Sequence, residues 1–113
     1  MLLRSEVVNA AKKGLSYELY KALIQTYGRR GEKAFLYLLQ RRVKRYRDFF
    51  VVVGRYEYVV EEYFCTCPDF QINLKGRSPC AHIIAVELAK LMRHYDEIDA
   101  FYVDFMKDMK WTR

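Results

Sequence analysis

The stretch from Cys65 to His82 reads CTCPDFQINLKGRSPCAH and holds all three cysteines of the chain and one of its two histidines. The four residues form two close pairs, Cys65 with Cys67 and Cys80 with His82, and twelve residues separate the pairs. Two such pairs joined by a short loop can converge on one ion, and three thiolates with one imidazole are a complete tetrahedral set for Zn²⁺. The spacing therefore predicts one structural zinc ion bound by Cys65, Cys67, Cys80 and His82.

Two other roles for the cysteines fit the sequence less well. An odd number leaves one thiol unpaired in any disulfide scheme, and a bridge within Cys-x-Cys would strain the disulfide. Cysteines that serve only as small apolar residues would not gather in one window beside a histidine. The opening MLLRSEVV has no sustained apolar run, so we expect an intracellular protein, cytoplasmic if prokaryotic. No stretch approaches the length of a membrane-spanning helix, so we expect no membrane partner.

The N-terminal part has the apolar spacing of three helices. Ser5 is expected to cap a helix of about residues 6–13 that Gly14 ends, and Ser16 to cap a second that Gly28 ends. The third helix is expected after Gly31, with an apolar stripe of Phe35, Leu38, Leu39, Val43 and Tyr46. Helical hairpins of this kind usually do not bind DNA, so the helix-turn-helix motif is not favoured.

After this region the apolar period changes from about 3.6 to 2. The runs FFVVV (49–53) and YEYVVEEYFC (56–65) predict two strands joined by a type II′ turn at Gly54-Arg55. Alternation along the second strand places Val59, Glu61, Tyr63, Cys65 and Cys67 on one face, and Tyr56, Tyr58, Val60 and Phe64 on the other. The one-residue spacing of the first ligand pair then follows from strand geometry, and Pro68 ends the strand.

The second ligand pair requires a helix start. Within an α-helix, residues i and i+2 point about 200° apart, so Cys80 must precede the regular helix if it is to share an ion with His82. Ser78-Pro79 is expected to supply the cap and a first-turn proline of a helix that runs to Tyr95. His94, in its last turn, is interpreted as a surface or capping residue without a metal role.

The fold class predicted from these elements is α+β. It comprises an N-terminal helical region (1–46), a ββα zinc module (47–95) and a C-terminal amphipathic helix (96–113). That last helix is inferred from the spacing of Ile98, Phe101, Tyr102, Phe105 and Met109. It is expected either to pack on the domain or, with Trp111, to dock on another protein.

The positive charge lies mainly in one block. Of a formal net charge of +6, residues 29–47 alone carry +7, from eight basic residues and one acid. Such a cluster can neutralise phosphates, while Tyr46, Tyr56 and Tyr58 could stack on unpaired bases. A solvated helix face is the ordinary alternative. The predicted nucleic-acid contacts are Arg29, Arg30, Lys33, Arg41, Arg42, Lys44, Arg45 and Arg47.

The order of hairpin, Cys-x-Cys, Cys-x-His and helix resembles the SWIM zinc-finger family over residues 47–95. Pro68-Asp69-Phe70 after the first pair, Pro79 before the second and the apolar run 83–86 are similar to family members as well. Ala81 departs from the basic residue often found at this position. Ala85 completes a Cys-x-His-x-x-Ala pattern that resembles the SWIM subunits of Shu-type recombination complexes. That resemblance implies a partner among paralogues of the RecA-family recombinase.

Catalysis is not expected, because four protein ligands leave the zinc no open position. The zinc-deaminase pattern needs a glutamate two residues after the histidine, where this chain has Ile84. We therefore expect a structural-zinc, DNA-associated accessory protein, in recombination or repair with a RecA-family paralogue as the resemblance implies. The alternative is a protein-interaction module that does not bind nucleic acid directly.

Overall fold

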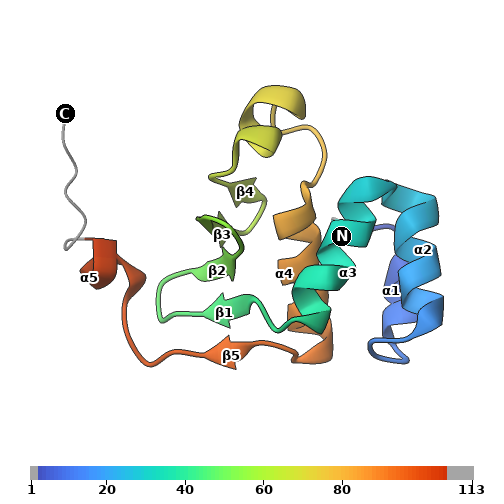
Figure 1. Cartoon of the computed structure of the whole chain (residues 1–113), viewed down its shortest axis with the longest axis horizontal. Helices are drawn as coiled ribbons and strands as arrows, with labels where there is room; N and C mark the ends of the chain where they lie inside the picture. Colours follow the sequence, from blue (N-terminus) through green and yellow to red (C-terminus); the bar gives the residue numbers. More distant parts are fainter. Residues whose placement is uncertain (1–2, 107–113) are drawn as a thin grey trace.

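The computed structural model describes residues 3–106 and shows an α+β fold (Figure 1). A five-stranded sheet with the order β4-β3-β2-β1-β5 lies on one side, and helices α1 to α3 lie on the other. The helices are α1 (Ser5–Ala11), α2 (Tyr17–Tyr27), α3 (Arg29–Leu39), α4 (Ala81–Met92) and α5 (Tyr102–Met106), with one π-helical turn η1 (Asp69–Asn73). The strands are β1 (Val43–Arg45), β2 (Phe50–Val53), β3 (Glu57–Glu61), β4 (Phe64–Cys65) and β5 (Asp96–Glu97).

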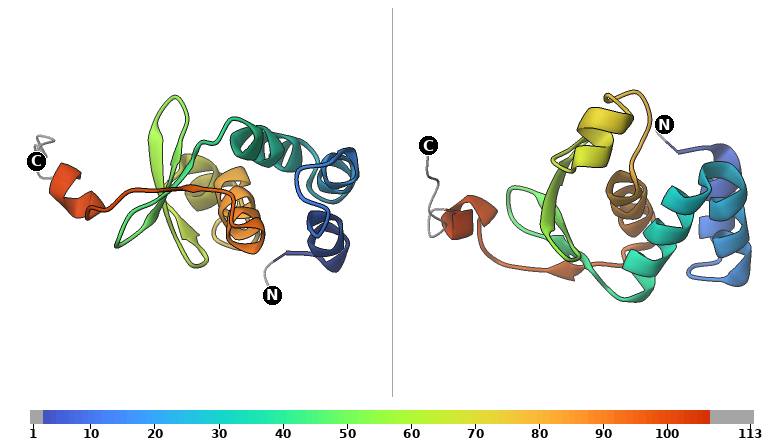
Figure 2. Two further views of the ribbon diagram at one scale, coloured as in Figure 1. Left: turned by 90° about the horizontal axis from the view of Figure 1, so that it is seen from below. Right: turned by 45° about the horizontal axis from the view of Figure 1, so that its top comes forward.

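Helix α4 is the centre of the core. Most of its length is apolar, and its buried residues are Ala81, Ile83, Ile84, Ala85, Val86, Leu88 and Ala89. A helix that is apolar on most of its surface needs neighbours on several sides. Accordingly, α4 packs on α3 and α1 on one side and on strands β1 to β4 on the other (Figure 2). The first turn of this central helix carries the second pair of zinc ligands.

The first two helices follow the predicted pattern closely. Ser16 caps α2 as predicted, because its hydroxyl accepts a hydrogen bond from the Leu19 amide at 3.2 Å. The cap predicted at Ser5 is wrong by one residue: Ser5 is already helical, and Arg4 holds the extended N-cap conformation without a side-chain bond. Helix α1 ends at Ala11, and Gly14 follows with a positive φ of 78°.

The junction of α2 and α3 is tighter than predicted. Gly28 alone separates the two helices, with a φ of 62° that favours glycine. Gly31 was predicted to precede α3, but it lies inside the helix and is buried against α2. A Cβ atom at this position would overlap the backbone carbonyl of Leu23. The glycine at position 31 thus allows α2 and α3 to pack closely.

The third helix is shorter than its apolar stripe predicted. It ends at Leu39, and Arg41 takes a left-handed conformation with φ 53° that turns the chain. Val43 then enters strand β1, where it pairs with Val52 of β2 and is buried. The prediction that Val43 and Tyr46 extend the helix is therefore wrong. A strand and a helix each bury only some of their residues, so the apolar pattern of so short a segment fits either. Pairing with β2 and β5 decides between the two.

The predicted hairpin exists, but its turns differ. Val53 pairs with Glu57, so the loop contains three residues, and Gly54 has no positive φ. The second predicted strand reverses at Glu62, whose φ is 52°, and β4 folds back on β3. Val60 therefore lies opposite Cys65 and both are buried, whereas one continuous strand would have placed them on opposite faces.

The segment predicted as one C-terminal helix begins as a strand. The Ile98 amide donates to the Arg45 carbonyl at 2.8 Å, and β5 pairs in parallel with β1. Helix α5 starts only at Tyr102, where the Asp48 carboxylate accepts hydrogen bonds from two backbone amides. Met109 and Trp111 lie outside the described residues.

The sheet draws strands from all three regions inferred from the sequence, and the division of the chain into those regions stays a prediction. Within residues 3–106, the helices are too short or too polar to cross a membrane.

Candidate metal centre

The four predicted ligands come from two neighbouring structural elements. Cys65 ends β4, and Cys67 follows it after the exposed Thr66, so both sulfurs point into the protein as the one-residue spacing predicts. Cys80 is the N-cap of α4, with an extended backbone (φ −82°, ψ 174°), and His82 lies in the first helical turn. The predicted start at Cys80 is therefore confirmed. Pro79 was expected in the first turn but precedes the helix, and Cys80 itself is the N-cap.

The geometry of the four residues fits a zinc ion. All three cysteines are buried free thiols, and the four ligand atoms lie within 4.8 Å of one another. The His82 Nδ1 atom is 3.7 Å from Cys65 Sγ and 3.8 Å from Cys80 Sγ. Tetrahedral bonding with Zn–S bonds of about 2.3 Å places ligand atoms about 3.6–3.8 Å apart. The four residues thus form a single Cys₃His structural zinc site. A zinc ion bound there would cross-link β4 to α4.

The thiols affect one another strongly because they are so close. Hydrogen bonds from Cys65 and Cys80 lower the pKa of Cys67, and the Phe70 amide adds a further bond to its sulfur at 3.4 Å. The pKa of Cys65 is raised, first by its hydrogen bond to Cys67 and also by burial. Cys65 lowers the pKa of Cys80, but the neighbouring Cys67 and burial outweigh it and raise that pKa to about 11. Zinc must therefore displace protons from Cys65 and Cys80.

Two tyrosines contact the imidazole of His82. The Tyr37 hydroxyl lies 3.3 Å from Nε2, and its ring is stacked on the imidazole at 5.3 Å between centroids. The Tyr58 ring lies 4.7 Å away. Since Nδ1 faces the sulfurs, the proton of the imidazole is on Nε2, and this N–H donates a hydrogen bond to the Tyr37 oxygen. The hydrogen bond orients the imidazole ring for metal binding. Tyr37 lies on α3, 45 residues before His82, and no motif in the sequence connects the two.

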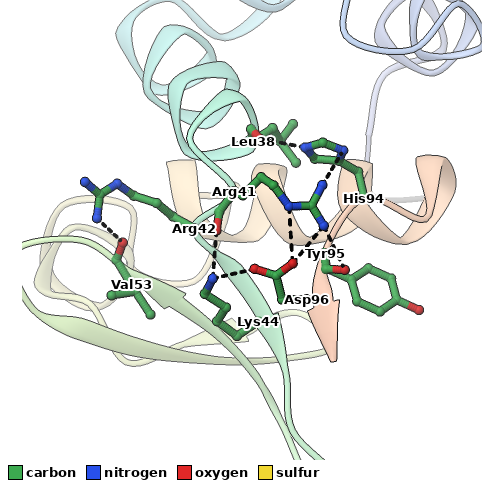
Figure 3. A network of polar contacts seen from close by, with 8 residues as sticks. All are labelled: Leu38, Arg41, Arg42, Lys44, Val53, His94, Tyr95 and Asp96. Carbon is green, nitrogen blue, oxygen red and sulfur yellow. Dashed lines mark hydrogen bonds and ion pairs between the residues drawn. The ribbon is translucent and has the colours of Figure 1, made fainter. Parts of the chain in front are cut away.

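Four of the eight predicted phosphate contacts are ion-paired to an acidic segment around β5. The parallel register places Lys44 beside Asp96 and Arg45 beside Glu97. The pairs are Arg41–Asp96 at 2.8 Å, Lys44–Asp96 at 2.6 Å, Arg45–Glu97 at 3.4 Å and Arg47–Asp99, with the first two drawn in Figure 3. Hydrogen bonds from Lys44 and then Arg41 lower the pKa of Asp96 to about 2. These cations are thus partly neutralised within the chain.

The other four basic residues lie in different surroundings. Arg42 donates to the Val53 carbonyl at 3.1 Å (Figure 3), and Arg30 forms a two-bond pair with Asp69. Arg29 and Lys33 are exposed, and neither has an ion-pair partner within residues 3–106. The eight basic residues therefore do not form one continuous free patch.

His94 has the capping role that was predicted, although it caps another helix. It follows α4, and its Nε2 atom donates to the carbonyl of Leu38, at the end of α3, at 2.8 Å. Arg41 approaches Nδ1 at 3.4 Å, and because a guanidinium only donates, Nδ1 accepts (Figure 3). Both ring nitrogens of His94 are thus engaged by protein groups, away from the metal centre.

Comparison with known proteins agrees with this geometry. A family model described as SWIM zinc finger matches residues 49–91, which span the hairpin, all four ligands and most of α4. A protein of Archaeoglobus fulgidus, described as uncharacterized, is 67% identical over 105 residues, or 93% of each chain. No solved structure shows a significant match. The finer likeness to Shu-type subunits stays a prediction. The Cys₃His cluster and the family match over the same residues show that residues 49–91 of this chain form a SWIM zinc finger.

Proposed function

We propose that this protein is a non-catalytic accessory factor that associates with DNA and with a protein partner. The observation that carries the proposal is the complete and buried ligand set, in which Cys65, Cys67 and Cys80 are less than 2% exposed. A catalytic zinc keeps a position for water or substrate, whereas this one is filled by protein. Zinc then acts as a clamp that holds β4 against α4, and partners bind to the surfaces that this clamp keeps in place.

One such surface is an aromatic groove beside the hairpin. A pocket of about 460 Å³ is lined by Tyr46, Tyr56, Glu57, Tyr102 and Phe105. Tyr56 is 63% exposed and Phe105 is 49% exposed, so both offer apolar area to a partner. Protein interfaces are enriched in aromatic anchors of this kind. The neighbouring cations Arg45 and Arg47 are paired with acids, which favours a protein over a phosphate backbone here.

The DNA association is proposed for the opposite end of the basic block, where Arg29 and Lys33 have no ion-pair partner among the described residues. A few free cations bind phosphates without reading sequence, and such binding weakens as salt rises. A partner among RecA-family paralogues, and hence a role in recombination or repair, is proposed from the resemblance to Shu-type subunits. The second candidate, an interaction module without nucleic acid, is favoured by the ion pairs of Arg41, Lys44 and Arg45.

Affinity capture tests the partner. The full chain is used as bait in lysate of the source organism, with and without nuclease, beside Tyr56→Ala and a matched Tyr17→Ala variant. Tyr17 is also an exposed tyrosine, at 68%, but it lies on α2. We expect nuclease-resistant recovery of a RecA-family paralogue that Tyr56→Ala loses and Tyr17→Ala keeps. Recovery of unrelated proteins only, or equal loss with both variants, would contradict the partner assignment.

A separate binding measurement tests the DNA association. Fluorescence anisotropy of labelled single- and double-stranded oligonucleotides with the zinc-loaded chain, at several salt concentrations, should give affinities that fall as salt rises. The absence of binding at low salt would leave the interaction module as the function.

A further inference from the structure

A pocket of about 470 Å³ opens beside the metal centre, between the start of α3, η1 and the start of α4. This volume lies within the range of small-molecule sites in proteins. Its polar lining consists of Arg29, Arg30, Lys33, Tyr37, Asn73 and His82, with Asp69 as the one acid. Three cations from a single helix end and one carboxylate give the pocket an excess of positive charge.

The positions of Arg29 and Lys33 are unfavourable for α3 itself. The two residues are four apart, so they lie on the same face of the helix, where like charges repel. They also lie in its first turns, at the positive end of the helix dipole. No described residue neutralises either side chain. A negatively charged ligand in the pocket would relieve both repulsions.

The negative charge of Asp69 is paired with Arg30, so this carboxylate mainly orients the guanidinium and repels an anion in the pocket only weakly. Its two carboxylate oxygens accept from Arg30 Nε at 2.8 Å and Nη2 at 2.9 Å, and one also accepts from Asn73. These two bonds hold the Arg30 guanidinium in one orientation at the edge of the pocket. Arg30 Nη1 has no hydrogen-bond partner within residues 3–106, so it remains available to a ligand.

Tyr37 connects the pocket to the metal centre. The Tyr37 oxygen accepts a hydrogen bond from the Nε2–H group of His82, so the Tyr37 hydroxyl hydrogen can donate to a ligand. The pocket thus combines one fixed guanidinium, two cations without an ion-pair partner within residues 3–106, and a hydroxyl donor. This combination suits the several oxygens of a phosphate group.

We propose that this pocket binds a phosphate group through the exposed side chains of Arg29 and Lys33 and the fixed guanidinium of Arg30. The phosphate belongs either to a free phosphomonoester or to the phosphodiester backbone of nucleic acid. The second source rests on the DNA association proposed above, and the first does not.

The test follows the amide spectra of the ¹⁵N-labelled, zinc-loaded full chain during titration. The probes are inorganic phosphate, adenosine 5′-monophosphate and a ten-residue oligothymidylate without terminal phosphates, all at matched ionic strength. The pocket variant is Arg29→Gln with Lys33→Gln. The control variant, Lys12→Gln with Lys13→Gln, removes the same charge from two exposed residues after α1.

We expect shifts at the start of α3, in η1 and at the start of α4. The dissociation constant should rise about tenfold or more in the pocket variant, because one charge-assisted hydrogen bond contributes roughly a factor of ten. The control variant should bind like the unaltered chain, and unchanged spectra without ligand verify folding.

Equal weakening in both variants, or shifts spread over the basic surface, would overturn the pocket. If the pocket variant retains oligonucleotide binding in full and no monophosphate binds, the pocket is overturned. The DNA association would then belong to a surface other than Arg29 and Lys33. Monophosphate binding lost in the pocket variant, without oligonucleotide binding, would support the pocket and refute the DNA association.

Discussion

Replacement of Cys67 by serine should remove the metal and most of the stability of the fold. A structural zinc ion contributes about 10–16 kcal/mol in comparable small sites. The whole unfolding free energy of a chain of 113 residues is expected at about 6–17 kcal/mol, from roughly 0.05–0.15 kcal/mol per residue. Because the two values are similar, loss of zinc removes most of the margin. A serine hydroxyl is a far poorer zinc ligand than a thiolate.

The loss should be greatest where the fold depends most on the ion. Strand β4 has two residues, and within residues 3–106 its one strand partner is β3, so we expect zinc to be its main link to α4. Metal content by mass spectrometry, urea unfolding by circular dichroism and amide spectra measure the effect. Thr66→Ser is the matched control, since Thr66 is exposed and serine retains the hydroxyl that accepts from the Val59 amide. A metal-free Cys67→Ser protein with the wild-type midpoint and intact β4 signals would refute the clamp.

Three further outcomes follow from the geometry. Apparent zinc affinity in a chelator competition should rise with pH, by about 100-fold per unit near neutrality, because Cys65 and Cys80 must each lose a proton; a pH-independent affinity would contradict this. Tyr37→Phe removes the acceptor for the zinc-binding imidazole and should weaken zinc about 10- to 100-fold in the same competition, and an unchanged affinity would mean that ring stacking alone orients it. Gly31→Ala should lower stability to urea by about 1–3 kcal/mol, because the new methyl group overlaps the Leu23 backbone; a more stable variant would show that α2 and α3 separate without cost.

The metal site could be predicted almost completely from the sequence, because its constraints are local. Residues i and i+2 share a side only in extended backbone, so the spacing of Cys65 and Cys67 requires a strand-like segment, and that of Cys80 and His82 requires a helix start. Both requirements concern the local backbone conformation alone and do not depend on contacts with the rest of the chain. The zinc ligands and the α+β class could therefore be inferred from the order of residues alone.

The charge and the contacts of the candidate binding surfaces, by contrast, depend on residues that are far apart in the chain. Arg41 to Arg47 are a basic run in the sequence. Only their pairing with acids in and just after β5, some fifty residues later, reveals that they are partly neutralised. Tyr37 acquires its role from His82, and the reversal at Glu62 brings Val60 and Cys65 onto one face.

Sequence by itself determined the ion and its four ligands, since covalent spacing limits where neighbouring side chains point. Tertiary structure decided which cations are neutralised, because neutralisation depends on distance in space. Within residues 3–106 it left Arg29 and Lys33 without ion-pair partners beside the clamp that Cys65 to His82 forms.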